Sequence, residues 1–145
     1  MPKIILGVDF GDARTGLAVA GKSGSIAVGA GLIRSEGFKT TVAAVADAAR
    51  REGAELIVGG NPLNMNGSEG PRSAKCRDFA QSLEQESGIK VVLYDERLTT
   101  VSAHRYLSDT GVKGKKRKAS VDELSATLIL QDYIDRSAKI ECSED

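Results

Sequence analysis

The sequence predicts an α/β fold built on one mixed sheet, and three observations support this. Apolar runs of strand length at residues 3–9, 56–59 and 91–94 are separated by longer segments with helical periodicity. Two more strand-like runs follow the first one directly, and glycines stand where helical patterns end, at Gly53 and Gly88. The order of elements is therefore β-β-β-α-β-α-β-α-α, in which strands joined through helices lie parallel.

The first three strands are expected to form an antiparallel meander. The almost wholly apolar run at residues 3–9 is typical of a central strand that is covered on both faces. Turn residues at positions 11–16 come next, and strands are predicted at residues 15–20 and 26–33. Because side chains alternate along a strand, Asp9 shares a face with Ile5 and Gly7.

Amphipathic helices are predicted in the rest of the chain. The first begins near residue 39, the second begins at Pro71, a third covers about residues 100–110, and the last begins with the capping box Ser120–Glu123 and ends near residue 136. The apolar stripes that predict three of these helices are Val42, Val45, Ala46 and Ala49; Cys76, Phe79, Ala80 and Leu83; and Ala126, Ile129, Leu130 and Tyr133.

Composition indicates an ordinary globular domain. The chain has 145 residues, which suits one domain, and we expect that domain over residues 1–137 with a polar, loosely held tail at residues 138–145. Its 20 basic and 20 acidic side chains cancel, so net charge does not point to a polyanionic partner. Two cysteines are too few for a disulfide framework. Without a leader or an apolar run of membrane-spanning length, we expect a cytoplasmic protein with no membrane partner.

Carboxylates stand where three predicted elements begin or end. Asp9 follows the first apolar run, Asp95 and Glu96 follow another, and Asp122 lies in the first turn of the last helix. Because carboxyl ends of parallel strands share one edge of a sheet, the first two groups should lie together, and such a cluster suits a divalent cation and phosphate chemistry. Plainer explanations exist, since Asp opens turns, an adjacent acid can pair with Arg97, and a helix dipole favours an acid in its first turn.

Two loops could contact phosphates. A dense basic run lies ahead of Asp122 and could make binding salt-dependent, although a charge run is usually only a solvated loop. This run has no interleaved aromatic residues, which argues against base stacking there. The segment at residues 60–70 is rich in Gly and Asn and is either a lid or an ordinary surface connection. The basic run ahead of Asp122 consists of Lys113, Lys115, Lys116, Arg117 and Lys118.

Four segments in this order resemble the YqgF/RuvX family of Holliday-junction-resolvase-like proteins and pre-16S rRNA nucleases. They are residues 7–11, 61–70, 95–100 and 121–122, and the match covers about residues 3–136. Asn61 and Asn66 stand where family members often carry Leu and Asp, and Ser125 replaces a common Ala. The resemblance implies an RNase H-like fold, a mixed five-stranded sheet with helices on both faces.

The resemblance also implies an activity and a set of site residues. The expected enzyme is a metal-dependent nuclease that helps to process the 5′ end of the small-subunit rRNA precursor. Asp9, Glu96 and Asp122 occupy the positions of the acidic set that holds one or two Mg²⁺ or Mn²⁺ ions, and the resemblance favours Glu96 over Asp95. Arg14, Arg97 and the basic run are expected to contact phosphates.

Other functions fit parts of the same pattern. Branched DNA could replace RNA as the substrate, and an obligate homodimer would support that interpretation over a monomer, because symmetric resolution needs two sites. The turn at residues 9–16 resembles the phosphate loop of actin-like ATPases, but those proteins need a second domain of comparable size. A ribosome-assembly factor that binds nucleic acid without cutting it, within a preribosomal particle, is a third interpretation.

Overall fold

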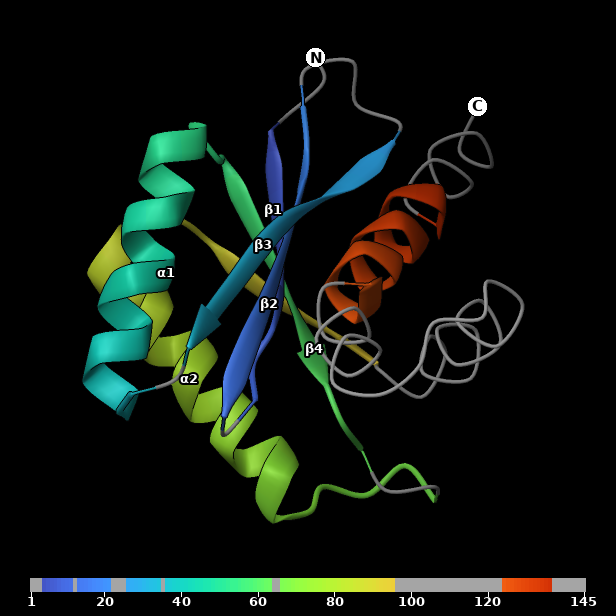
Figure 1. The fold of residues 1–145 in the computed structure, drawn as a ribbon. Coiled ribbons are helices and arrows are strands. Elements are labelled where there is room, and N and C mark those ends of the chain that lie inside the picture. The colour runs from blue at the N-terminus through green and yellow to red at the C-terminus, as the bar shows by residue number, and fades with distance from the viewer. Residues whose placement is uncertain are drawn as a thin grey trace, which may run out of the picture.

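A five-stranded mixed sheet forms the centre of the chain in the computed structural model, with helices on both of its faces (Figure 1). The structure describes residues 4–11, 13–21, 26–34, 36–63, 66–95 and 124–136. The elements are β1 (Ile5–Asp9), β2 (Arg14–Ala20), β3 (Ala27–Arg34), α1 (Phe38–Glu52), β4 (Leu56–Asn61), α2 (Pro71–Ser87) and β5 (Val91–Asp95). A further helix covers residues 124–136. The predicted fold class is confirmed.

The pairing of the strands brings several strand ends to one edge of the sheet. The strand order is β3-β2-β1-β4-β5, so β1 is central, as predicted. β1 pairs antiparallel with β2 and parallel with β4, and β4 pairs parallel with β5. The carboxyl ends of β1, β4 and β5 therefore meet at one edge, here called the carboxyl edge. The start of β2 and the end of β3 lie at the same edge.

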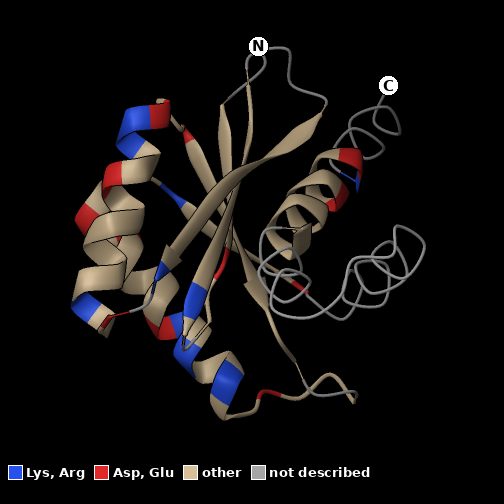
Figure 2. Cartoon of the chain, viewed as in Figure 1, with Lys and Arg blue, Asp and Glu red and all other residues tan. Residues whose placement is uncertain are grey.

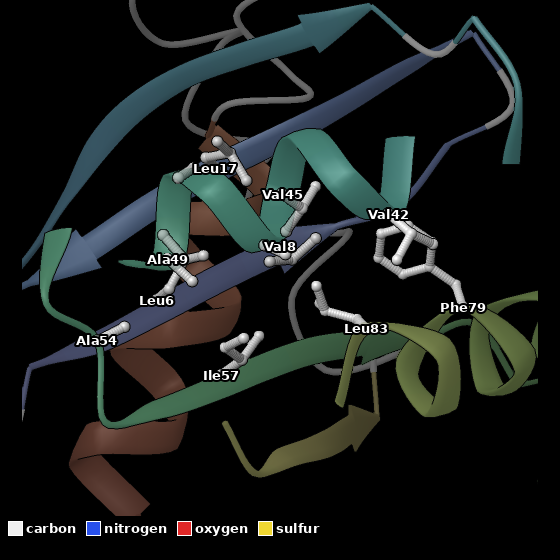
Figure 3. Close-up of a cluster of buried hydrophobic side chains, with 12 residues drawn as sticks. Leu6, Val8, Leu17, Val42, Val45, Ala49, Ala54, Ile57, Phe79 and Leu83 are labelled. Carbon is white, nitrogen blue, oxygen red and sulfur yellow. The ribbon is translucent and has the colours of Figure 1, made fainter. Parts of the chain in front are cut away.

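The helices α1 and α2 cover one face of the sheet, where the larger hydrophobic core forms (Figure 3). Leu6 and Val8 of β1 point into this core together with Ile57 of β4, and all three are almost fully buried. All the residues of the two predicted helical stripes are buried. Both helices end at a glycine with positive φ, Gly53 at 72° and Gly88 at 70°, as the sequence predicted.

The helix at residues 124–136 covers the other face. Ala126, Ile129 and Leu130 are fully buried there, against a sheet face that includes Ala18 and Val58. The contact is close because β1 carries a glycine at its centre. A Cβ on Gly7 would lie 2.8 Å from the Leu130 Cβ and 3.0 Å from the Ala126 carbonyl oxygen. None of the described helices is long and apolar enough to cross a membrane.

A β-bulge shifts the register of the outer hairpin. Ala18 pairs with Gly29, but the preceding residue Leu17 pairs with Gly31, so Ala30 is an extra residue in β3. Gly31 has a φ of 105°, which glycine adopts without the steric cost of a Cβ. As a consequence, the pairing between β3 and β2 is shifted by one residue for every β3 residue after the bulge, compared with an unbroken ladder.

Element boundaries differ slightly from the prediction. β4 continues two residues beyond the predicted end, to Asn61, because its parallel partner β5 supplies pairing as far as Asp95. Several predicted features lie outside the described residues. These are the helix at residues 100–110, the basic run, Glu96, Arg97, Asp122, and the tail at residues 138–145.

Candidate active site

Asp9 ends β1 at the carboxyl edge and is half-buried. Its partner across the antiparallel ladder is Gly16, which has no side chain. Ile5 belongs to the core beneath the helix at residues 124–136, and Gly7 contacts that helix. Because side chains alternate along β1, the Asp9 carboxylate projects from this same face, beyond the point where the helix meets Gly7.

Asp95 also lies at the carboxyl edge, but on the opposite face. The register places Gly7 beside Val58, and Val58 beside Val92, so these three residues share the face of Asp9. Val92 and Tyr94 pack against the helix at residues 124–136, which agrees with this assignment. Alternation then directs Asp95 towards the face that carries α1 and α2. The Asp95 side chain therefore turns away from Asp9.

A polar network fixes the start of α2 against the end of β4. The buried Ser73 hydroxyl donates a hydrogen bond of 2.5 Å to the Asn61 side-chain oxygen, and Glu69 Oε1 lies 3.5 Å from the same hydroxyl. Glu69 also forms a 3.0 Å ion pair with Arg77. The loop before α2 is thus anchored at both of its ends. Ser73 was not identified from the sequence as the partner of Asn61.

Two arginines lie opposite each other at the carboxyl edge. Arg14 begins β2, and the bulge in β3 places Arg34 directly across the ladder from it. Like charges in directly opposed positions repel, so this pair favours an anion nearby. Figure 2 shows basic segments at the start of β2 and in the first turns of α1 and α2, close to this edge. The sequence predicts a phosphate contact for Arg14, which stays a prediction, and Arg34 was not named from the sequence.

The hydroxyl of Tyr94 is buried, and no group in the described part of the chain forms a hydrogen bond with it. Burial, followed by the negative charge of Asp132, raises the pKa of this phenol above its ordinary value. Burial also raises the pKa of Asp132, while Arg136 opposes both shifts. The Arg136 guanidinium lies 5.9 Å from the centre of the Tyr94 ring. The phenol therefore stays neutral at physiological pH.

The described part of the site supplies one suitable metal ligand. Carboxylate oxygens are the ligands that Mg²⁺ and Mn²⁺ prefer, and Asp9 presents such a group at the carboxyl edge. Within the described residues, no group of three or more His, Cys, Asp or Glu side chains could hold a metal ion. The donor chemistry of Asp9 fits a hard divalent cation. The other two members of the predicted acidic set, Glu96 and Asp122, lie outside the described residues.

The chain matches a known protein family over most of its length. A family model for RuvX, described as Holliday junction resolvase, matches residues 3–136. The chain belongs to the RuvX family. The family predicted from the four sequence segments is therefore confirmed. Two relatives named "Putative pre-16S rRNA nuclease" are each 41% identical to the chain, from Ruminiclostridium cellulolyticum (92% of this chain, 95% of the relative) and Moorella thermoacetica (91% and 94%).

Solved structures of RuvC and of a viral resolvase share the fold of this RuvX family member. Thermus thermophilus RuvC, solved with a Holliday junction substrate, has a TM-score of 0.60 at 16% identity, covering 93% of this chain and 96% of that one. The fowlpox virus Holliday junction resolvase has a TM-score of 0.56 at 14% identity, covering 92% and 99%. At these identities the likeness concerns the fold, and it confirms the RNase H-like class.

Proposed function

We propose that this chain is a metal-dependent nuclease that hydrolyses phosphodiester bonds in RNA and processes the 5′ end of pre-16S rRNA in the cytoplasm. The observation that carries the proposal is the position of Asp9, half-buried at the carboxyl edge of the central strand in a RuvX family member. Ligands of open α/β sheets bind beyond the carboxyl ends of the strands. The names of the close relatives support RNA as the substrate.

Asp9, Glu96 and Asp122 would hold the metal, one or two ions of Mg²⁺ or Mn²⁺. Glu96 is preferred to Asp95 because Asp95 belongs to the opposite face of the sheet. Asp122 stands two residues before Leu124, where the description of the last helix begins, and that helix packs on the Asp9 face. Metal bound by such a set lowers the pKa of a water molecule and offsets the negative charge of the phosphate.

Basic side chains would orient the substrate beside these acids. Arg14 and Arg34 lie at the carboxyl edge and can neutralise adjacent phosphates of one strand. Arg97 and the basic run at residues 113–118 follow β5 in the sequence and are proposed to add further phosphate contacts. Guanidinium groups suit this purpose because their planar donors match two phosphate oxygens at once.

Branched DNA is the second candidate substrate, favoured by the description of the RuvX family as Holliday junction resolvases. The direct test offers the wild-type protein a single-stranded rRNA-precursor leader and a four-way DNA junction, each with Mg²⁺, Mn²⁺ or EDTA. We expect cleavage of the RNA that requires a divalent ion. Cleavage confined to the junction would replace RNA by branched DNA, and undiminished cutting in EDTA would contradict a metal-dependent reaction.

Arg34 provides a test of the phosphate contacts. Arg34→Ala should weaken binding of single-stranded RNA similarly for different sequences, because a phosphate contact carries no base information. The slope of log K against log salt concentration should fall by about 0.7, the contribution of one phosphate contact on a single strand. Fluorescence anisotropy at several salt concentrations measures both quantities. Arg51→Ala, an exposed arginine in the last turn of α1, is the control and should leave the slope unchanged.

A further inference from the structure

A cavity of about 580 Å³ opens between α1 and α2 on the face of the sheet opposite to the Asp9 side chain. Phe10 and Phe38 form its apolar wall, and the rest of its lining comes from Gly37 and Thr41 at the start of α1 and from polar side chains of α2. The volume lies within the usual range for small-ligand sites. The polar lining residues on α2 are Lys75, Asp78, Gln81 and Ser82.

The three phenylalanines of the chain meet at this cavity, although they are far apart in the sequence. Phe10 stacks on Phe79 with ring centres 4.2 Å apart and an interplanar angle of 16°. Phe38 stands edge-on to both rings, at 6.4 Å from Phe10 and 6.1 Å from Phe79. Phe79 is buried, whereas Phe38 is 44% exposed. The buried Phe79 ring therefore packs against Phe10 and Phe38, while part of the Phe38 ring faces solvent.

This cavity lies next to the candidate active site. Phe10 immediately follows Asp9, and the two side chains leave the carboxyl edge on opposite faces of the sheet. Arg34 ends β3 four residues before Phe38, while Lys75 lines the cavity itself. A strand of nucleic acid that passes over the edge at Asp9 would meet these basic groups and the aromatic wall together.

We propose that the cavity binds one unstacked base of the nucleic acid strand whose phosphate lies at Asp9. The proposal rests on the nuclease function proposed above. Exposed aromatic rings bind bases by stacking, and every base offers such a face. The Gln81 and Ser82 side chains can form hydrogen bonds with base edges, and the Asp78 carboxylate can accept one from a base N–H group. Lys75 in the lining and Arg34 nearby complement the flanking phosphates. The basic run lacks aromatic residues, but this cavity draws its rings from α1 and from the end of β1.

The test compares two labelled oligomers of equal length and charge, an eight-residue oligouridylate and a ribose-phosphate chain of the same length without bases. Binding is measured by anisotropy in EDTA, so that neither oligomer is cut. Wild type should bind the oligouridylate about tenfold more tightly than the abasic chain. Phe38→Ala should lose this difference, and Phe38→Tyr should keep it. The amide resonances of Phe38 and Gln81 should shift with the oligouridylate alone.

Ile26→Ala is the matched control, because Ile26 is an apolar residue with 69% exposure immediately before β3, far along the strand from Arg34. Thermal unfolding checks that each variant is folded, and Phe38→Leu, which keeps most of the apolar volume, should also lose the difference. Equal binding of the two oligomers by wild type would overturn the base site while leaving phosphate binding intact, as would a Phe38→Ala protein that still discriminates. Failure of wild type to bind either oligomer would overturn the base site, whereas the cleavage test with Mg²⁺ or Mn²⁺ described above decides the nuclease function separately.

Discussion

Asp9→Asn is expected to abolish hydrolysis of the rRNA-precursor leader while leaving the fold unchanged. Asparagine has nearly the same shape but removes the negative charge that a divalent cation requires of its ligand. Loss of even an outer-shell partner of a metal ligand costs about 10–100-fold, so loss of the ligand itself should cost at least about 100-fold. Single-turnover cleavage with Mg²⁺ measures the loss of activity, and a titration with Mn²⁺ should show that Asp9→Asn binds this ion more weakly than wild type.

Asp95→Asn is the sharpest control for this result. Both residues end strands at the carboxyl edge, but Asp95 belongs to the face that carries α1 and α2. We expect Asp95→Asn to keep most of the activity. Full metal-dependent activity in Asp9→Asn would refute the site assignment, and a larger loss in Asp95→Asn than in Asp9→Asn would show that the opposite face carries the chemistry.

Gly7→Val should destabilise the protein by about 1–3 kcal/mol, the usual cost of overpacking. Even a single Cβ at this position would lie 2.8 Å from the Leu130 Cβ, and valine adds two methyl groups beyond it. A loss of stability would be informative, because valine is otherwise favoured over glycine in a strand. The helix at residues 124–136 would have to move outward, and Asp122 precedes it in the chain, so cleavage should also fall. Urea unfolding and the cleavage assay measure the two effects.

Gly21→Val serves as the comparison for the steric argument. An added Cβ at Gly21 has nothing within 4 Å, so its stability should change by less than about 0.5 kcal/mol. Equal stability of wild type and Gly7→Val would mean that the helix does not press on β1 as closely as the structure indicates.

Local patterns in the sequence were enough to predict the elements and their caps. Pro71 begins α2, Gly53 and Gly88 end helices, and the apolar stripes of α1 and α2 are buried, because each signal acts within a few residues. The position of Asp9 at a shared edge also followed, since parallel strands joined through helices must present their carboxyl ends together. These are properties of single elements and of their order.

Features that depend on register could not be predicted. The opposition of Arg14 and Arg34 needs the bulge at Ala30, because an unbroken ladder would have placed Ile33 across from Arg14. Gly29 and Gly31 are compatible with a bulge in β3, but they do not fix the position of the register shift before the pairing is known. The aromatic cavity likewise depends on how α1 and α2 pack, which brings Phe10 and Phe38 together from separate elements. Tertiary packing decides both features.

The close contact between Gly7 and Leu130 has a consequence for protein synthesis. It joins the first strand to the last described helix, and the hydrogen bond from Ala27 to Gln131 spans 104 residues in the same way. The β1–β2–β3 meander can pair as soon as it leaves the ribosome, but the face around Asp9 is covered only by the helix at residues 124–136, whose Gln131 is made 104 residues after Ala27. A nascent chain thus carries Asp9 long before the packing around it is complete, and the site reaches its final geometry only after that helix has been made.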